Sequence, residues 1–477
     1  MNTLRRTKIV VTVGPSLDDL SMLERVILAG GVIFRANFSH GEMDVHEKRI
    51  QNVRLLAEKH GISVAILVDL QGPKIRIGKF INHQVTLVEG QKFVLDTELG
   101  DALGNEHTVS LGYRDLPKDV RVDDTLLLDD GRIVFKVIQV EVNKIFCHVL
   151  VGGVLSDNKG INRLGGGLSA AALTDKDRVH IKEAVRLNAD YIAVSFPRNA
   201  DDIHLARTLL QAAGGTQGII AKIERSEAIT HIESIIQASD AIMIARGDLG
   251  VEIGDAELPA VQKKIIKIAR TFNKPVITAT QMLETMINNT IPTRAEVSDV
   301  ANAVLDGTDA VMLSGETAVG RYPDKAVAAM DRICLSAEKH NSVKIMRYPK
   351  ERQMKQVDDA IAMATMYTAN HLTIKAIIAL TESGTTPLLM SRINSNIPIY
   401  GLSRHPVTLR LMNLYRGVYP ILFEPTHIDR RILNKAAIAE LQNRGILSAG
   451  DRVIVTKGDL IGVHGRTNSM KIMIVGE

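Results

Sequence analysis

The sequence predicts an α/β protein built on a closed barrel of eight parallel strands, a (β/α)8 barrel, with an inserted all-β domain and a further α/β domain. Eight short β-branched runs alternate with segments of helical periodicity, and each run ends on polar or glycine residues. In a closed barrel the carboxyl ends of all strands share one face, so these polar ends would meet in one cleft. The runs are Lys8–Gly14, Val32–Ser39, Ser63–Leu70, Asp190–Phe196, Gly218–Glu224, Ala241–Gly250, Pro275–Met282 and Ala310–Thr317.

Helices are expected between successive runs. The first, Leu20–Ala29, has an apolar stripe and follows Ser16–Asp19, a segment suited to capping its amino end. Eight strand–helix units up to about residue 340 favour closure into a barrel, and an open doubly wound sheet is the alternative. The other expected helices are His46–His60, Lys176–Leu187, Ala200–Ala212, Ala228–Ala238, Leu258–Phe272, Arg294–Leu305 and Pro323–His340.

One interval interrupts this alternation. After Asp69–Arg76, about eighty residues show period-two patterning and turn signals, including Asp129–Gly131 and Val142–Asn143, but no helical stripe. We expect an all-β insertion that re-enters the barrel near Asn158–Gly160. Because it enters among the polar strand ends, a lid that excludes water is favoured over a decorative insertion. Its expected strands are His83–Val88, Lys92–Leu95, Thr125–Leu128, Ile133–Gln139 and Lys144–Val151.

A third region follows the charged linker Lys344–Lys355. It should begin with the helix Val357–His371 and continue as an open α/β sheet with helices between at least its first four strands. The predicted domains are the barrel at residues 1–70 and 159–345, the lid at 71–158 and the C-terminal domain at 351–477. The expected strands of the C-terminal sheet are Ala376–Leu380, Ile397–Leu402, Tyr419–Leu422, Arg452–Val455 and Lys471–Val475.

Composition excludes several classes of protein. The net charge of +4 and the aromatic content of 4% give no basic, aromatic surface for nucleic acid. Two cysteines cannot build a disulfide framework and indicate a reducing cytoplasm. The first apolar run is too short for a signal peptide, and no stretch approaches the roughly 20 apolar residues of a membrane span. We expect a soluble, cytoplasmic protein.

The strongest chemical pattern is Lys222 and Glu224 on the fifth run with Asp248 on the sixth. Alternate residues of a strand share a face, so Lys222 and Glu224 would both point into the barrel mouth, near Asp248 on the neighbouring strand. Two carboxylates suit Mg²⁺ or Mn²⁺, and a lysine beside them would offer positive charge to a phosphoryl group. A structural ion pair is the alternative, and Asp248 makes the metal site the favoured one.

Other polar groups follow the remaining runs. Arg35 and Arg76 offer planar forks of donors for phosphate oxygens, and Gly247 lets a carboxylate approach the backbone. His40 is a candidate ligand or a surface histidine with equal weight. Gly165–Gly167 is either a phosphate cradle or, as we favour, a flexible connection. Further candidates from these strand ends are Asn37, Ser39, Asp69, Lys74, Thr280 and Ser314.

Several sites are absent from the sequence. It contains no G-x-x-x-x-G-K-[ST] and no G-x-G-x-x-G pattern, which excludes a P-loop and a Rossmann dinucleotide site. No cysteine–histidine spacing suits zinc, and no nucleophile elbow supports a serine hydrolase. Phosphate handling by arginines, a lysine and a carboxylate-bound metal remains.

The segment Ile219–Glu227 strongly resembles the signature segment of the pyruvate kinase family. The resemblance extends over essentially the whole chain and is highly specific. It implies a TIM barrel, the β lid, a C-terminal regulatory domain, a homotetramer, and phosphoenolpyruvate and ADP as substrates. The other matching segments are Asn37–Gly41, Ala245–Glu252, Thr278–Met282, Pro292–Glu296 and Asp309–Glu316.

The resemblance also implies roles for individual residues. Lys222 would stabilise the phosphoryl group in transfer, and Glu224 and Asp248 would hold Mg²⁺ or Mn²⁺. Enolate protonation would occur near Thr280 and Ser314. The implied substrate-binding residues are Arg35, Gly247, Asp248 and Thr280, and the implied nucleotide-binding residues are Arg76, Lys159 and His40.

The chain departs from the family at one place. Family members that require potassium typically have Thr, Lys and Glu where this chain has Leu70, Gln71 and Lys74. A lysine ammonium in place of a carboxylate would substitute for K⁺ and repel it. We therefore expect activity without potassium, and a monovalent-cation pocket at Asn37, Ser39, Asp69 and Leu70 becomes doubtful.

The C-terminal domain has its own signal in Ala376–Thr386, which runs from a strand into an expected helix. Hydroxyls and amides at a helix amino end bind anions. The resemblance implies an allosteric pocket for a phosphorylated effector, a sugar phosphate or nucleoside monophosphate, and a plain capping turn is the alternative. The candidate residues are Thr381, Ser383, Gly384, Thr385 and Thr386.

Two other functions remain open from the sequence. The barrel could use its lysine and carboxylates for aldol or mutase chemistry on pyruvate-like substrates. The chain could instead be a catalytically silent homologue that binds phosphorylated metabolites. The lid and the arginines disfavour the first, and the presence of every residue that catalysis requires disfavours the second.

Overall fold

The computed structural model describes residues 4–100, 102–339, 354, 356–459 and 467–477. Its chain divides into two compact units, one of residues up to 68, 186–192 and 266–477, and one of residues 69–185 and 193–265. Apart from Met354, the expected linker Lys344–Lys355 lies outside the described residues, as does the expected helix end at His340. No helix among the described residues combines the length and apolar character needed to cross a membrane.

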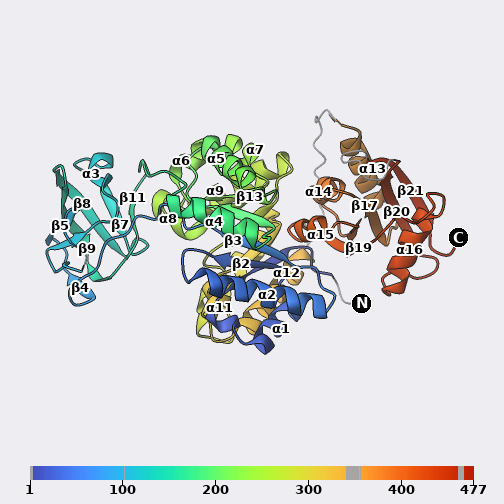
Figure 1. Ribbon diagram of the computed structural model, residues 1–477, viewed down its shortest axis with the longest axis horizontal. Helices are drawn as coiled ribbons and strands as arrows, with labels where there is room; N and C mark the ends of the chain where they lie inside the picture. Colours follow the sequence, from blue (N-terminus) through green and yellow to red (C-terminus); the bar gives the residue numbers. More distant parts are fainter. Residues whose placement is uncertain (1–3, 101, 340–353, 355, 460–466) are drawn as a thin grey trace. The chain divides into compact units, whose positions relative to one another are not determined.

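Eight parallel strands close into a barrel in the order β1-β16-β15-β14-β13-β12-β3-β2, which confirms the predicted barrel over the open sheet. The strands are almost completely buried, as parallel strands covered by helices must be. Figure 1 labels several of them. Their bounds are β1 (Lys8–Val13), β2 (Ile33–Asn37), β3 (Ala65–Asp69), β12 (Tyr191–Val194), β13 (Gly218–Ile223), β14 (Ala241–Ala245), β15 (Val276–Ala279) and β16 (Ala310–Leu313).

Two of the expected strands are too long because short helices replace their ends. Helix α8 (Arg246–Ile253) starts directly after β14, and α11 (Gly315–Ala318) starts two residues after β16. Gly247 and Asp248 therefore lie in the first turn of a helix, not on a strand. A carboxylate in a first turn is stabilised by the helix dipole.

The helices otherwise follow the sequence prediction closely. Asp19 caps α1 (Leu20–Leu28) by accepting from the backbone N of Ser21 at 3.0 Å. Thr293 and Glu296 form a capping box at the start of α10 (Arg294–Asp306). The expected helix Ala228–Ala238 is wrong as one piece, because the chain forms α6 (Ser226–Thr230) and α7 (Ile232–Ala238). The remaining elements are η1 (Pro15–Leu17), α2 (Met43–Lys59), α4 (Asp175–Arg186), α5 (Ala200–Ala212), α9 (Leu258–Thr271), η2 (Glu284–Ile287) and α12 (Pro323–Glu338).

The insertion is a curled six-stranded sheet, in the order β11-β7-β8-β9-β5-β6, with a separate β4–β10 pair. Asp129 and Asp130 adopt φ of +49° and +56° in the turn between β7 and β8, which suits a tight hairpin. The expected re-entry near Asn158–Gly160 is too early, because β11 still pairs with β7. The elements are β4 (Gln84–Leu87), β5 (Lys92–Asp96), β6 (Thr108–Ser110), α3 (Leu116–Asp119), β7 (Thr125–Leu128), β8 (Ile133–Val140), β9 (Lys144–Val151), β10 (Gly153–Ser156) and β11 (Ile161–Arg163).

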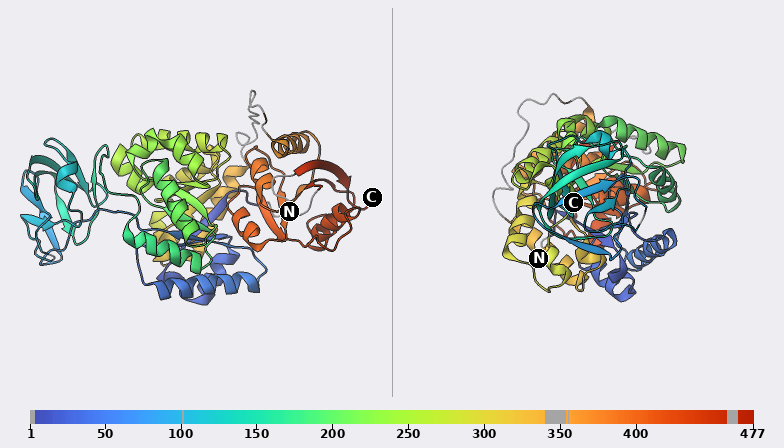
Figure 2. Two further views of the ribbon diagram at one scale, coloured as in Figure 1. Left: turned by 45° about the horizontal axis from the view of Figure 1, so that its top comes forward. Right: turned by 90° about the vertical axis from the view of Figure 1, so that its left-hand side faces the viewer.

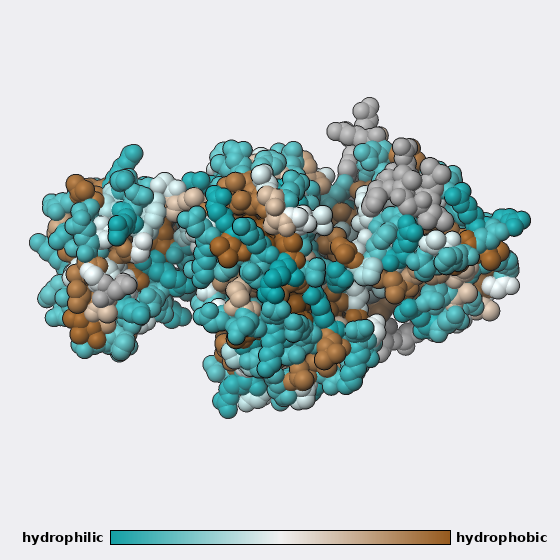
Figure 3. Space-filling model, viewed as in Figure 1, coloured by the Kyte–Doolittle hydropathy of each residue, from teal (hydrophilic) through white to brown (hydrophobic). Residues whose placement is uncertain are grey.

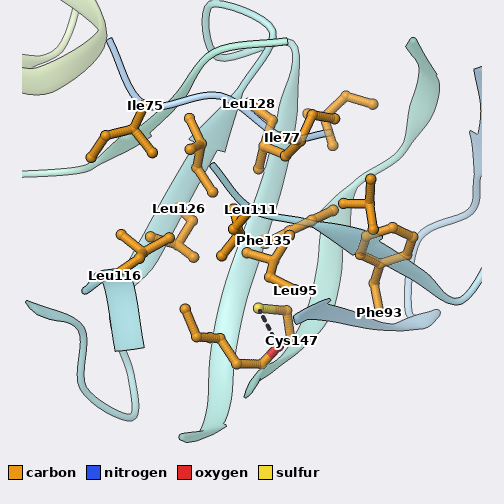
Figure 4. Packing of buried hydrophobic residues seen from close by; sticks show 14 of the residues in the cluster. Ile75, Ile77, Phe93, Leu95, Leu111, Leu116, Leu126, Leu128, Phe135 and Cys147 are labelled. Carbon is orange, nitrogen blue, oxygen red and sulfur yellow. Dashed lines mark hydrogen bonds between the residues drawn. The ribbon is translucent and has the colours of Figure 1, made fainter. Parts of the chain in front are cut away.

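The insertion encloses its own hydrophobic core (Figure 4). Phe93 and Phe135 are fully buried in it, with ring centroids 5.3 Å apart. On the face of the insertion seen in Figure 3, hydrophobic areas lie among hydrophilic ones. The apolar side chains of the insertion thus pack mainly against one another in a cluster of their own.

The C-terminal domain is an open sheet in the order β19-β18-β17-β20-β21 (orange to red in Figure 2), as predicted. Neighbouring strands are parallel except β21, which runs antiparallel to β20. The elements are α13 (Val357–His371), β17 (Ala376–Leu380), α14 (Thr385–Ser391), β18 (Ile399–Ser403), α15 (Pro406–Met412), β19 (Val418–Leu422), α16 (Leu433–Asn443), β20 (Arg452–Gly458) and β21 (Thr467–Ile474).

A buried ion pair joins this domain to the barrel. Arg392, at the C-cap of α14, donates from Nη1 to Asp309 Oδ2 at 2.9 Å. Asp309 precedes β16 and also accepts from the backbone N of Val276 at 3.0 Å and of Arg416 at 3.2 Å. Its side chain is completely buried. The carboxylate therefore holds together the amino ends of β15 and β16 and two segments of the C-terminal domain.

Candidate active site

The ammonium group of Lys222 on β13 lies among three polar groups at strand ends. Its Nζ is 3.1 Å from Asp69 Oδ1 and 3.0 Å from Glu224 Oε1, and it donates to Ser195 Oγ at 2.7 Å. The Lys222 side chain is only 11% exposed. Asp69 ends β3, Ser195 follows β12 and Glu224 follows β13. The predicted common direction of Lys222 and Glu224 is confirmed.

Glu224 is a buried carboxylate with a raised pKa. Burial raises its pKa, and the nearby Asp248 and Asp69 carboxylates raise it further, while Lys222 opposes both effects. Its Oε2 accepts from the backbone N of Phe196 at 2.9 Å. Phe196 adopts φ of +56°, a conformation that a bulky residue takes only where its surroundings enforce it. The strained backbone of Phe196 thus supports one oxygen of Glu224.

Asp248 lies close enough to Glu224 to raise its pKa, as the pairing of β13 with β14 predicts. Its Oδ1 accepts from Lys74 Nζ at 2.9 Å. Within the described residues, no group of three or more His, Cys, Asp or Glu side chains is arranged to hold a metal ion. Glu224 and Asp248 stay the predicted Mg²⁺ ligands, since Mg²⁺ takes few protein ligands and keeps several waters.

Lys74 forms an ion pair with Asp248, and its expected replacement of a monovalent cation stays a prediction. The Lys74 ammonium lies against Asp248, and the Lys222 ammonium lies against Asp69. Asn37 Oδ1 accepts from the backbone N of Ser39 at 3.2 Å, which forms a local turn. Leu70 is buried and donates from its backbone N to Ala193 O.

Three further candidates lie in the other unit, each at the carboxyl end of its own strand. Arg35 on β2 is buried and donates from Nη1 to Thr12 Oγ1 at 3.0 Å. Thr280 after β15 adopts φ of +65°, which is rare for a β-branched residue and marks a constrained position. The buried Ser314 Oγ, after β16, has no hydrogen-bond partner among the described residues.

The predicted nucleotide-binding residues lie on the connections to the lid or on the surface. Arg76 and Gly160 form an antiparallel bridge between the two connections. Arg76 Nη1 donates to Asn158 O at 2.8 Å, and Lys159 Nζ lies 2.7 Å from Asp129 Oδ1. His40 is exposed after β2. Their roles stay predictions.

The amides of Gly165–Gly167 are already engaged by the protein. Gly165 N donates to Glu252 O at 3.0 Å, Gly166 N to Arg163 O at 3.0 Å, and Gly167 N to Glu227 Oε1. A phosphate cradle needs amides free to point at an anion. The structure therefore favours the connecting role of this segment.

The predicted effector loop lies at the start of α14, where its polar groups bond to one another and to Thr467. Gly384 is the N-cap with φ of +81°, and its N donates to Thr381 Oγ1 at 2.9 Å. Ser383 Oγ and Thr385 Oγ1 are 2.8 Å apart, and Thr386 Oγ1 is 2.7 Å from Thr467 Oγ1. These bonds occur in a capping turn and in an anion site without its anion, so both interpretations stay open.

Ser195 and Phe196 are the site residues that sequence analysis left without a role. The run Asp190–Phe196 ends on them, which was their only signal. Their contributions come from contacts with Lys222 and Glu224 on the neighbouring strand. No local pattern contains that information.

A closed parallel barrel with a buried lysine among carboxylates at its strand ends defines a barrel enzyme that acts on anionic substrates. The family described as "Pyruvate kinase, barrel domain" matches residues 4–327, and "Pyruvate kinase, alpha/beta domain" matches residues 359–473. The chain belongs to the pyruvate kinase family, and its activity is that of a pyruvate kinase, a phosphotransferase.

Individual relatives agree over the full length. The chain is 53% identical to pyruvate kinase II of Salmonella typhimurium over 476 residues, which cover 99% of each chain. It is 53% identical to a pyruvate kinase of Buchnera aphidicola subsp. Schizaphis graminum over 479 residues, 100% of this chain and 99% of the relative. The crystal structure of a pyruvate kinase from Cryptosporidium parvum superposes with a TM-score of 0.89 at 36% identity, over 99% of this chain and 96% of the other.

Proposed function

We propose that the chain transfers the phosphoryl group of phosphoenolpyruvate to ADP and releases pyruvate and ATP. The observation that carries the proposal is the buried Lys222 ammonium, fixed by Asp69, Ser195 and Glu224 at the carboxyl end of β13. Phosphoryl transfer needs positioning and neutralisation of charge more than covalent chemistry. A preorganised ammonium in a site of low exposure supplies both.

The family uses a divalent metal. Glu224 and Asp248 would hold Mg²⁺ or Mn²⁺ in this chain, since both carboxylates already attract lysine ammonium groups. When bound, the ion would neutralise charge on the substrate carboxylate and phosphate. The raised pKa of Glu224 agrees with a carboxylate whose ionised form requires such a cation.

Other residues would bind and orient the substrates. Arg35 would bind phosphate oxygens, and the Gly247 backbone and Thr280 would bind phosphoenolpyruvate. The constrained φ of Thr280 supports its role, because strained residues gather at functional sites. After transfer, the enolate carbon would take a proton from a water or hydroxyl relay near Thr280 and Ser314.

We assign the nucleotide phosphates to Arg76, Lys159 and His40. Arg76 and Lys159 supply positive charge on the two connections to the lid. Closure of the lid would then bring nucleotide binding and exclusion of water together. We also propose that the protein is cytoplasmic and that it forms a homotetramer. Sedimentation velocity would test the homotetramer.

A coupled assay for pyruvate tests the proposed reaction. Pyruvate should form only when phosphoenolpyruvate, ADP and Mg²⁺ are all present. Loss of phosphoenolpyruvate without ADP and without pyruvate would favour mutase chemistry. Pyruvate released from an aldol adduct, with no phosphoenolpyruvate present, would favour aldol chemistry. Calorimetric binding of both substrates without turnover would favour a silent homologue.

We expect the wild-type enzyme to work at near full rate in tetramethylammonium buffer, with little stimulation by KCl. The Lys74 ammonium supplies fixed positive charge at Asp248. In Lys74→Glu this charge is reversed, so activity should then depend on KCl. Lys79→Glu, which makes the same charge change at the lid residue Lys79, is the control. A large KCl stimulation of the wild type would contradict the proposal.

We propose that Thr381 and Ser383–Thr386 bind a phosphorylated effector. The same domain also has a cavity of about 240 Å³ that Arg430, Lys457 and the acidic Asp459 line; none of the residues from 381 to 386 lines it. Sugar phosphates and nucleoside monophosphates, titrated at limiting phosphoenolpyruvate, should include one that lowers the half-saturating concentration. An unchanged value with every compound would favour a plain capping turn.

A further inference from the structure

The chain returns from the lid to the barrel through residues 164–174, between β11 and α4. We call Gly165–Ala170 the return strap. Three consecutive glycines begin it, with φ of +84°, +76° and +89° at Gly165, Gly166 and Gly167. Glycine adopts this left-handed backbone conformation at little cost, because it has no Cβ. Any other residue at these three positions would be strained.

The barrel side of the strap is held by the residues that directly follow the predicted metal ligand Glu224. Arg225 donates from Nη1 to Leu168 O at 3.0 Å and from Nη2 to Ala170 O at 3.4 Å. Ser226 Oγ donates to Gly165 O at 2.9 Å. The strap is thus bonded to the continuation of the strand that carries Lys222.

Helix α8, which carries Asp248, also bonds to the barrel side of the strap. The backbone O of Glu252 accepts from Gly165 N at 3.0 Å, and its Oε2 accepts from Ser226 N at 2.8 Å. Glu252 is only 3% exposed. Glu227 accepts from Gly167 N. The strap is therefore linked to both elements that carry the proposed metal ligands.

The strap and the residue Arg163 also form hydrogen bonds with the lid. Ser169 N donates to Asp119 Oδ2 at 2.9 Å, and Ser169 Oγ lies 2.9 Å from Tyr113 Oη. Arg163, just before the strap, donates from Nη2 to Asp124 Oδ1 at 3.0 Å. Asp119, Tyr113 and Asp124 all belong to the lid. The strap consequently has hydrogen bonds to both sides.

We propose that Arg225, Glu227 and Glu252 are positioning residues that fix the return strap and so set where the lid presents its nucleotide-binding side chains. This inference rests on the proposed function, which places Arg76 and Lys159 on the nucleotide. A loosened strap would spread the positions of these two side chains. The variants tested below change neither Glu224 nor any residue of α8, so the defect should fall mainly on ADP.

Two neighbouring glycines provide a matched test. A Cβ on Gly166 would lie 2.1 Å from Ser226 Oγ and 2.7 Å from Glu227 Oε2, whereas a Cβ on Gly165 has nothing within 4 Å. Both positions have positive φ, so both alanine variants carry similar backbone strain. Gly166→Ala should raise the KM for ADP about fivefold, the equivalent of one lost hydrogen bond, and leave the KM for phosphoenolpyruvate unchanged. Gly165→Ala should change the KM for ADP by less than about twofold.

Glu227 tests the strap from the opposite side. Glu227→Ala should raise the KM for ADP as Gly166→Ala does, and Glu227→Gln, which keeps an acceptor for Gly167 N, should restore most of the affinity. Glu233→Ala, an exposed change on α7, is the control. Hydrogen exchange of the strap amides, measured by mass spectrometry on the full chain, should accelerate in Gly166→Ala and Glu227→Ala only.

The proposal is overturned if Gly166→Ala and Gly165→Ala share one KM for ADP, or if strap exchange accelerates without any change in that KM. A wild-type protein that forms no pyruvate would instead overturn the proposed function, and the exchange experiment would still report on the strap.

Discussion

Turnover of the Lys222→Met variant is expected to fall by at least about 10²–10³, the scale of one preorganised charge donor. Methionine keeps the length and apolar stem of lysine and removes the ammonium that lies between Asp69 and Glu224. Steady-state assays at saturating phosphoenolpyruvate and ADP measure this loss. Because the charge acts on the group in transfer, kcat should fall much more than either KM changes.

In Lys222→Met, a loss of turnover through unfolding must be distinguished from a loss of catalysis in the folded protein. Removing one partner from a buried ion cluster destabilises the protein, so the assay belongs at a temperature where circular dichroism shows the native state. Lys182→Met, an exposed change on α4, should keep wild-type turnover. Near-normal turnover in Lys222→Met would remove Lys222 from its proposed role.

The Asp309→Ala variant is expected to lose about 3–5 kcal/mol of unfolding free energy, the cost of leaving a buried charge unpaired. The substitution strips Arg392 of its partner and leaves the backbone N–H groups of Val276 and Arg416 without their acceptor. Thermal and denaturant unfolding followed by circular dichroism measures the loss. Turnover at low temperature should change far less than stability.

The exposed ion pair of Asp324 and Arg25 is the control for the buried pair of Asp309 and Arg392. Asp324 pairs with Arg25 at 3.2 Å with both side chains partly exposed, and Asp324→Ala should cost about 1 kcal/mol or less. Burial alone would raise the pKa of Asp309, but Arg392 and Arg270 outweigh it and hold the pKa below its ordinary value. The stabilisation by this carboxylate is therefore present above about pH 4 and is lost as the pH falls through the folded-state pKa. Equal melting temperatures for Asp309→Ala and Asp324→Ala would contradict this account.

The barrel and the central site residues could be predicted because both rest on short-range patterns. Buried parallel strands are continuous apolar runs, and the run Gly218–Glu224 contains β13 almost to the residue. The two-residue period of that strand placed Lys222 and Glu224 on one face. The structure brings them to 3.0 Å.

Features that depend on distant contacts could not be predicted. The start of α8 at Arg246 was missed because its glycines favour no helix, and Glu252 anchors it through a bond to Ser226. The partner of Lys74 is Asp248, far along the chain. Strands such as β6 and β11 were missed because three residues are too few to show a period.

The insertion's private core around Phe93 and Phe135 has a consequence for how this part of the chain can change. A substitution there acts first on neighbours of the same cluster, whose buried members among the described residues all lie between Ile75 and Ala170. Variation in the module can thus adjust its mobility while the register of the eight scaffold strands, and the chemistry they support, is preserved.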